Sequence, residues 1–177
     1  MVSGPLKSET IESPKSKTKE QSRINSTMQR HDVSMAMIDI SKKGDVERVA
    51  EVSGSIKLKS STVERIKSGN IKKGDVLGCA ETAAILAVKK TPDMIPLCHP
   101  ISIEAVKVYF SIGESDIKAT VSVKSIGKTG VEMDALHGLS VALLTIWDMV
   151  KSEEKDETGN YPHTWIEKIR VEKKEKG

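Results

Sequence analysis

The sequence WDMVK, from Trp147 to Lys151, carries an acidic and a basic side chain three residues apart. On a helix this spacing places Asp148 and Lys151 on the same side, close enough to form an ion pair. A lysine held by an aspartate and partly removed from water can donate or accept a proton, because burial and neighbouring charge move its pKa. An ordinary surface ion pair worth less than about 1 kcal/mol explains the same spacing.

A second candidate is the stiff segment IPLCHP, in which prolines flank Leu97, Cys98 and His99. Each proline fixes its own φ, and Pro100 also drives His99 into extended backbone. An imidazole held in this way suits a directed polar contact or a proton transfer. A loop histidine beside a buried cysteine is the competing interpretation. Cys98 and Cys79 lack the spacing of a metal motif, so we expect two free thiols and no metal site.

The sequence GKTGVEMD, which starts at Gly127, marks a turn from a predicted strand into a predicted helix. Backbone N–H groups at such a turn, together with Lys128, can face an anion. Thr129 and Glu132 have the spacing of a capping box, which predicts a structural role for Glu132. Asp134, two residues further into the helix, has no such structural reason and is a candidate site carboxylate.

Lysines recur at the predicted ends of helices and strands. Each one alone is an ordinary partner for a helix dipole, but as a group they could surround a polyphosphate. The group comprises Lys73, Lys89, Lys90, Lys128, Lys151, Lys173 and Lys174. The whole chain has 28 Lys and Arg against 25 Asp and Glu, and only 3% aromatic residues. It therefore lacks both the positive field and the aromatic surface of a nucleic-acid-binding domain.

The elements that position these residues fit one folded domain in a chain of 177 residues. Residues 1–34 are polar and show no sustained apolar period, so we expect a disordered tail before a folded domain at 35–177. No apolar run reaches the roughly 18 residues of a membrane span, and the chain begins with a polar segment. We therefore expect a cytoplasmic protein without a membrane span or signal peptide.

Hydrophobic periodicity and turn residues predict an α+β fold. In chain order we expect strands at 35–40 and 48–58, helices at 61–69 and 76–90, a hairpin of strands at 101–112 and 117–126, a helix at 131–151 and a strand at 165–171. We expect a bulge at Gly54 in the second strand. The first helix should start in a Ser61–Glu64 capping box, and Asp75 should cap the second. Without the first strand, this order is typical of a ferredoxin-like βαββαβ domain with two helices on one face of an antiparallel sheet. The two longer helices are so apolar that we expect an oligomer.

Five sequence blocks, in this order and spacing, resemble the molybdenum cofactor biosynthesis protein C family, the cyclic pyranopterin monophosphate synthases. The blocks are MIDIS (37–41), KGDV (73–76), KKTPDMIPLCHP (89–100), GKTGVEMDAL (127–136) and SVALLTIWDMVK (140–151). The resemblance implies a phosphorus–oxygen lyase that converts 3',8-cyclo-7,8-dihydroguanosine 5'-triphosphate to cyclic pyranopterin monophosphate and pyrophosphate. It also implies a homohexamer of three dimers with active sites at the dimer interface, and no cofactor beyond a Mg²⁺ ion that the triphosphate could carry.

The resemblance also assigns roles to individual residues. It implies that Asp148 is the active-site carboxylate and that Lys151 and Lys73 are catalytic lysines. The implied substrate-binding residues are Leu97, Cys98, His99, Glu132, Met133, Asp134, Arg48, Lys89 and Lys174.

The chain departs from the family's pattern in a longer loop at 155–162, before the last predicted strand, and in three further places. Asp134 stands where the family usually has Glu, His137 and Gly138 replace a small polar residue and an alanine, and the ending KKEKG replaces a glycine-rich segment. A non-enzymatic ligand-sensing module is the alternative function, because ferredoxin-like domains with different functions share this topology. That alternative predicts no turnover and no requirement for Asp148 or Lys151.

Overall fold

The computed structural model describes residues 35–177, so the disordered tail predicted at 1–34 lies outside the described residues. From Ala36 to Gly177 the chain forms one compact unit. Its elements are β1 (Val46–Lys57), α2 (Ser60–Lys67), α3 (Val76–Lys89), α4 (Thr91–Met94), β2 (Ile103–Ile112), β3 (Asp116–Gly127), α5 (Glu132–Glu154) and β4 (Trp165–Lys176).

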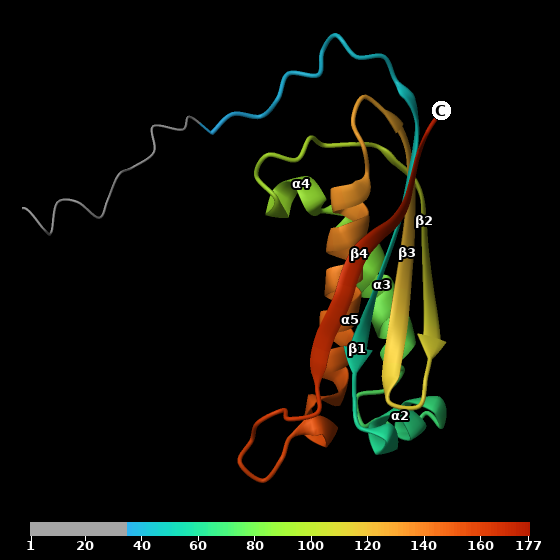
Figure 1. Cartoon of the computed structure of the whole chain (residues 1–177), viewed down its shortest axis with the longest axis vertical. Helices are drawn as coiled ribbons and strands as arrows, with labels where there is room; N and C mark the ends of the chain where they lie inside the picture. The colour runs from blue at the N-terminus through green and yellow to red at the C-terminus, as the bar shows by residue number, and fades with distance from the viewer. Residues whose placement is uncertain (1–34) are drawn as a thin grey trace, which may run out of the picture. The chain divides into compact units, whose positions relative to one another are not determined.

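The four strands form one sheet in the order β2-β3-β1-β4, and every neighbouring pair is antiparallel. Helices α3 and α5 pack against each other, with α5 on β1 and β3 and α3 on β2 (Figure 1). The short α2 and α4 lie at opposite ends of this layer (Figure 1). The order and pairing confirm the predicted ferredoxin-like α+β fold.

The core lies between the sheet and the two long helices. In β3, Ile117, Ala119, Val121 and Val123 are fully buried, and the residues between them are less buried, as expected for a strand with one covered face. Helix α5 adds buried residues at helical spacing, including Leu139, Leu143 and Ile146. Among the described helices, α5 is long and apolar enough to cross a membrane by length and composition alone, but half of that stretch is buried here, as in an ordinary core helix.

One predicted strand is absent, and the predicted bulge is confirmed at its position. Residues 35–40 form no strand, because this segment forms a cavity wall instead of pairing with a sheet edge. The irregularity predicted at Gly54 is present, but the extra residue is in β4, where Lys168 has a φ of 58°. Gly54 permits this bulge, because a Cβ there would lie 3.0 Å from Cγ1 of Ile169 and 3.1 Å from Cδ1 of Leu143.

Neither predicted capping box forms. The N-cap residues of α2 and α5 are Lys59 and Val131, and neither makes a side-chain capping hydrogen bond. At α2, the buried carboxylate of Glu154 accepts the Lys59 backbone N–H instead. At α5, Glu132 forms an ion pair with Lys174 on β4. The cap predicted at α3 is correct, since Asp75 accepts a hydrogen bond from the Gly78 N–H at 3.0 Å.

Candidate active site

Three charged side chains meet at the C-terminal end of α5. The Asp148 carboxylate accepts a hydrogen bond from Nζ of Lys151 on Oδ1 and another from Nζ of Lys73 on Oδ2, both at 2.7 Å. Lys73 Nζ also donates to the Asp148 backbone carbonyl at 2.7 Å. The predicted Asp148–Lys151 pair is therefore present, and the structure brings Lys73 to the same carboxylate.

The charges of this cluster set its protonation states. Hydrogen bonds from Lys151 and then from Lys73 lower the pKa of Asp148 to about 2, so its carboxylate is ionised at neutral pH. Asp148 in turn raises the pKa of Lys151. The three side chains are 41–57% exposed, so a single chain does not shield the cluster from water in the way expected for a catalytic lysine. Lys151 is here a protonated, hydrogen-bonded ammonium group.

Local backbone structure holds Lys73 in place. It lies in the turn between α2 and α3, directly before Gly74, whose φ is 96°. The Gly74 N–H donates to the Ile71 carbonyl at 2.9 Å, and the next residue, Asp75, caps α3. The left-handed conformation at Gly74 is one that glycine adopts without steric cost. The KGD sequence therefore combines a tight turn and a helix start that fix the position of the lysine backbone.

The other predicted stretches meet at the N-terminal end of α5. A cavity of about 360 Å³ is lined by Leu97, Cys98, His99, Glu132, Met133 and Asp134, together with Ala36, Ile38, Ile40, Lys43, Ile101, Thr129 and Gly130. The six residues implied by the resemblance thus surround one space. The wall at 36–43 contains no predicted site residue, although part of it lies in the MIDIS block that contributed to the resemblance.

His99 is tied to this wall. Its Nε2 lies 2.8 Å from the backbone carbonyl oxygen of Ile38, which can only accept a hydrogen bond, so Nε2 carries the proton. Lys128 Nζ donates to the Ser41 carbonyl at 3.4 Å on the same segment. The predicted stiff histidine segment is therefore part of a packed cavity wall rather than a free loop.

Asp134 is the buried carboxyl of the cavity, with 4% of its surface exposed. Burial raises the pKa of Asp134, and burial followed by the charge of Asp134 raises the pKa of the neighbouring Cys98 thiol. One helical turn further on, Nδ1 of His137 lies 3.2 Å from Oγ1 of Thr91. This wall of the cavity therefore holds a carboxyl that takes up a proton more readily than a free aspartate.

A smaller cavity of about 170 Å³ adjoins the first through Gly130 and Glu132. Arg48 and Lys174 line it, as the resemblance implies, and Lys174 Nζ lies 3.3 Å from Oε1 of Glu132. Arg48 Nε is buried and has no hydrogen-bond partner among the described residues. Lys89, at the end of α3, lines neither of these cavities. Among residues 35–177, no group of three or more His, Cys, Asp or Glu side chains is arranged to hold a metal ion.

The two groups of candidate residues lie at opposite ends of α5. A helix rises about 1.5 Å per residue, so the roughly 15 residues from Met133 to Asp148 span about 22 Å. The helix α2, beside the lysine–aspartate cluster, and α4, beside the cavity, mark these two ends in Figure 1. Within one chain, the cluster and the cavity are therefore separate sites.

Comparison with known proteins places the chain in a family. Residues 37–177 match the family model described as the MoaC family. A protein named "Probable cyclic pyranopterin monophosphate synthase" from Methanococcoides burtonii is 64% identical over 140 residues, which cover 79% of this chain and 88% of that protein. A protein of the same name from Archaeoglobus fulgidus is 57% identical over 146 residues, covering 82% of this chain and 94% of that protein. These matches confirm the resemblance seen in the sequence, and the chain belongs to the MoaC family.

Proposed function

We propose that this protein is a cyclic pyranopterin monophosphate synthase of molybdenum cofactor biosynthesis. It converts 3',8-cyclo-7,8-dihydroguanosine 5'-triphosphate to cyclic pyranopterin monophosphate and releases pyrophosphate, as a phosphorus–oxygen lyase. Family membership supports the reaction, and the observation that carries it is the pair of lysines on one carboxylate, Lys73 and Lys151 on Asp148.

The cluster suits the proton transfers of this reaction. Opening the imidazole ring and closing the pterin require protons to be delivered to nitrogen and removed from carbon or oxygen. Lys151 is protonated and held in one orientation by Asp148, so it is placed to act as a general acid, and Lys73 is held against the same carboxylate. Asp148 keeps the two ammonium groups close together despite their repulsion.

The second step needs cations at a phosphate chain. When a sugar hydroxyl attacks the α-phosphorus to close the cyclic phosphate, negative charge builds on the leaving pyrophosphate. We assign Arg48 and Lys174, which line the smaller cavity, to this charge. For Lys89, which lines neither cavity, only the family resemblance supports the same role. Leu97, Cys98, His99, Glu132, Met133 and Asp134 would hold the ring system in the adjoining larger cavity. A Mg²⁺ ion, where present, would arrive with the triphosphate as part of the substrate.

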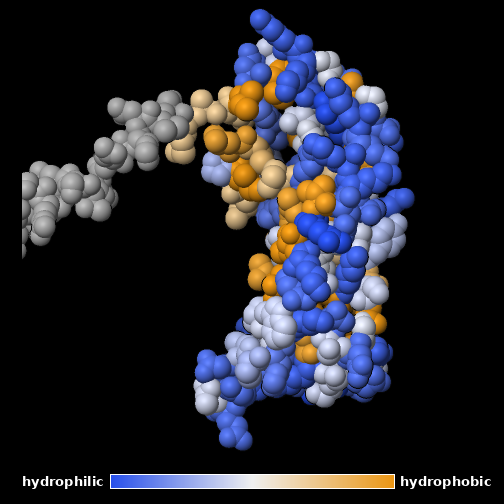
Figure 2. All heavy atoms as spheres, viewed as in Figure 1, coloured by the Kyte–Doolittle hydropathy of each residue, from blue (hydrophilic) through white to orange (hydrophobic). Residues whose placement is uncertain are grey.

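A complete site requires two copies of the chain. The cavity and the lysine–aspartate cluster are about 22 Å apart along α5, too far for one small substrate to touch both. The structure leaves large apolar side chains exposed, including Leu86, Met94 and Leu144. Figure 2 shows hydrophobic atoms gathered on the side where Figure 1 has α4 and α5. We propose that this surface contributes to a homohexamer of three dimers in which one copy's cluster completes the cavity of another.

The direct test is incubation of the purified protein with the cyclised guanosine triphosphate, with pyrophosphate and product followed by mass spectrometry. We expect turnover in the wild type, loss of turnover in Lys151→Ala, and wild-type turnover in Lys107→Ala, an exposed lysine on β2. Binding without turnover in the wild type would support the ligand-sensing alternative and contradict the proposed reaction. Because substrate and product are water-soluble nucleotide derivatives, we place the reaction in the cytoplasm.

A further inference from the structure

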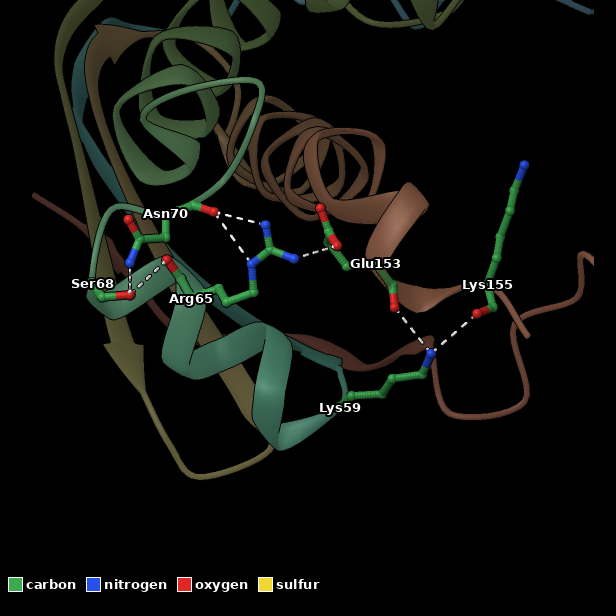
Figure 3. A network of polar contacts seen from close by, with 6 residues as sticks. All are labelled: Lys59, Arg65, Ser68, Asn70, Glu153 and Lys155. Atoms are coloured by element: carbon green, nitrogen blue, oxygen red, sulfur yellow. Dashed lines mark hydrogen bonds and ion pairs between the residues drawn. The ribbon is translucent and has the colours of Figure 1, made fainter. Parts of the chain in front are cut away.

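The helix α2 carries none of the residues assigned above, yet both of its ends are fastened to the end of α5 that carries the lysine–aspartate cluster. At its start, Lys59 donates its backbone N–H to the buried Glu154 carboxylate at 3.1 and 3.2 Å. The Lys59 ammonium also donates to the carbonyls of Glu153 and Lys155, at 3.0 and 3.2 Å (Figure 3). These contacts satisfy carbonyls that the end of a helix leaves without partners.

The last turn of α2 is fastened by Arg65. Its Nη1 donates to Oε2 of Glu153 at 2.6 Å, while Nε and Nη2 donate to the backbone carbonyl of Asn70 at 3.3 and 2.9 Å. Figure 3 shows the guanidinium between these two partners, one on α5 and one on the loop after α2. A planar guanidinium can donate in two directions at once, which a lysine ammonium on a flexible stem does less well.

The two partners of Arg65 lie beside the two halves of the cluster. Asn70 precedes Lys73 by three residues in the same turn, and Glu153 follows Lys151 by two residues on α5. The ion pairs within the cluster are exposed, and exposed ion pairs fix geometry only weakly. The turn that carries Lys73 therefore needs a further anchor to keep its ammonium in register with Asp148.

We propose that Arg65 is a positioning residue that sets the placement of Lys73 relative to Asp148 and Lys151 by bridging the Asn70 carbonyl and the Glu153 carboxylate. The inference rests on the proposed function for its effect on catalysis, but the bridge itself is a feature of the fold. Misplacing a catalytic group by about 1 Å can lower a rate on the order of 100-fold, so loosening this turn should affect turnover more than substrate binding.

The test compares Arg65→Gln with a charge swap, Arg65→Glu with Glu153→Arg. The swap can restore the ion pair, but a glutamate cannot donate to the Asn70 carbonyl. We expect kcat to fall about 10-fold in Arg65→Gln with KM within about threefold of wild type, and to stay low in the swap even where its Tm recovers. The matched control is Arg170→Gln, which breaks an exposed Arg–Glu pair on β4.

A second measurement does not depend on catalysis. Hydrogen exchange of the backbone amides at 70–75 should accelerate locally in Arg65→Gln and in the swap, and stay unchanged in Arg170→Gln. Recovery of kcat by the swap would show that Arg65 acts only through its ion pair, and would overturn the proposal. Unchanged exchange at 70–75 in Arg65→Gln would overturn the proposal as well. This measurement does not require turnover, so it tests the role of Arg65 even if the wild type proves inactive, an outcome that would contradict only the proposed reaction. Arg65→Lys is the substitute if Arg65→Gln does not fold, with a smaller change in the same direction.

Discussion

At the scale of single residues, the central feature is a carboxylate that binds two ammonium groups. The spacing of Asp148 and Lys151 made their contact predictable, because residues three apart on a helix are neighbours. Lys73 lies 75 residues away in sequence from Asp148, and no local pattern could bring it there. Its place was expected only from the family resemblance, and the structure supplies the physical reason in the turn before α3.

Asp148→Asn should remove the group that orders both lysines. The amide has no charge to raise the pKa of Lys151, so that pKa should fall, while the lost orientation should lower kcat by about 100-fold or more. Steady-state kinetics over a range of pH and ¹⁵N spectra of the lysine ammonium measure the two effects. Asp116→Asn, which breaks a half-buried pair with Lys57, is the control and should change neither. An unchanged kcat in Asp148→Asn would remove the cluster from the mechanism.

We expect the Asp134 carboxyl to lower the folding stability of the domain while contributing to turnover. Burial raises the pKa of Asp134 in the folded state above its ordinary value of 3.8, so folding disfavours the ionised carboxylate. The resulting loss of folding stability is absent at low pH and grows as the pH rises from 3.8 through the folded pKa. Asp134→Asn should therefore raise Tm by about 2–4 °C at pH 7, with the gain shrinking in acid, while turnover falls. Thermal unfolding from pH 3 to 8 tests this, and a gain that is the same at every pH would show that the carboxyl charge is not its source.

At the scale of elements, local patterns predicted what is locally determined. The hairpin β2–β3 and the helices α3 and α5 follow from alternation and helical spacing of apolar residues, because each has one buried face. The start of α2 was predicted within one residue, but its cap was not predictable, since it comes from Glu154, 95 residues beyond Lys59. The wall at 36–40 was also misassigned, because a short apolar segment that lines a cavity has the same pattern as a short strand.

The packing of α3 against α5 depends on Gly138. A Cβ at this position would lie 2.6 Å from Cγ2 of Val88 and 3.1 Å from the Ala84 carbonyl oxygen. Gly138→Ala should therefore destabilise the domain by about 1–2 kcal/mol, because overpacking outweighs the gain in helix propensity. Denaturant unfolding measures the change. Val88→Ala in the same chain should recover part of the loss, and additive effects of the two substitutions would contradict this contact as the cause.

At the scale of the whole molecule, the length of α5 separates two groups of candidate site residues. One end of this helix contributes Met133 and Asp134 to a cavity, and the other contributes Asp148 and Lys151 to a charged cluster about 22 Å away. The proposed reaction binds a ring system and a phosphate chain and transfers protons at the same substrate, so it needs both the cavity and the cluster. In a two-fold symmetric dimer, a contact between residue i of one copy and residue j of the other is repeated between residue j of the first and residue i of the second, so two shared sites would form together.

Shared sites can be detected by complementation between two inactive variants. Lys151→Ala keeps an intact cavity and Asp134→Ala keeps an intact cluster, so each homo-oligomer should be inactive, yet an oligomer containing both variants should hold some sites built from two unaltered halves. With equal and random mixing, about half of the cavities are intact, and about half of these meet an intact cluster from the neighbouring copy. About a quarter of the sites are then whole, so we expect about a quarter of wild-type turnover. Co-expression with two different affinity tags, followed by purification on both, isolates the mixed oligomers for assay. If cavity and cluster served the same chain's substrate, no site in the mixture would be whole, and the mixed oligomers would be as inactive as their parents.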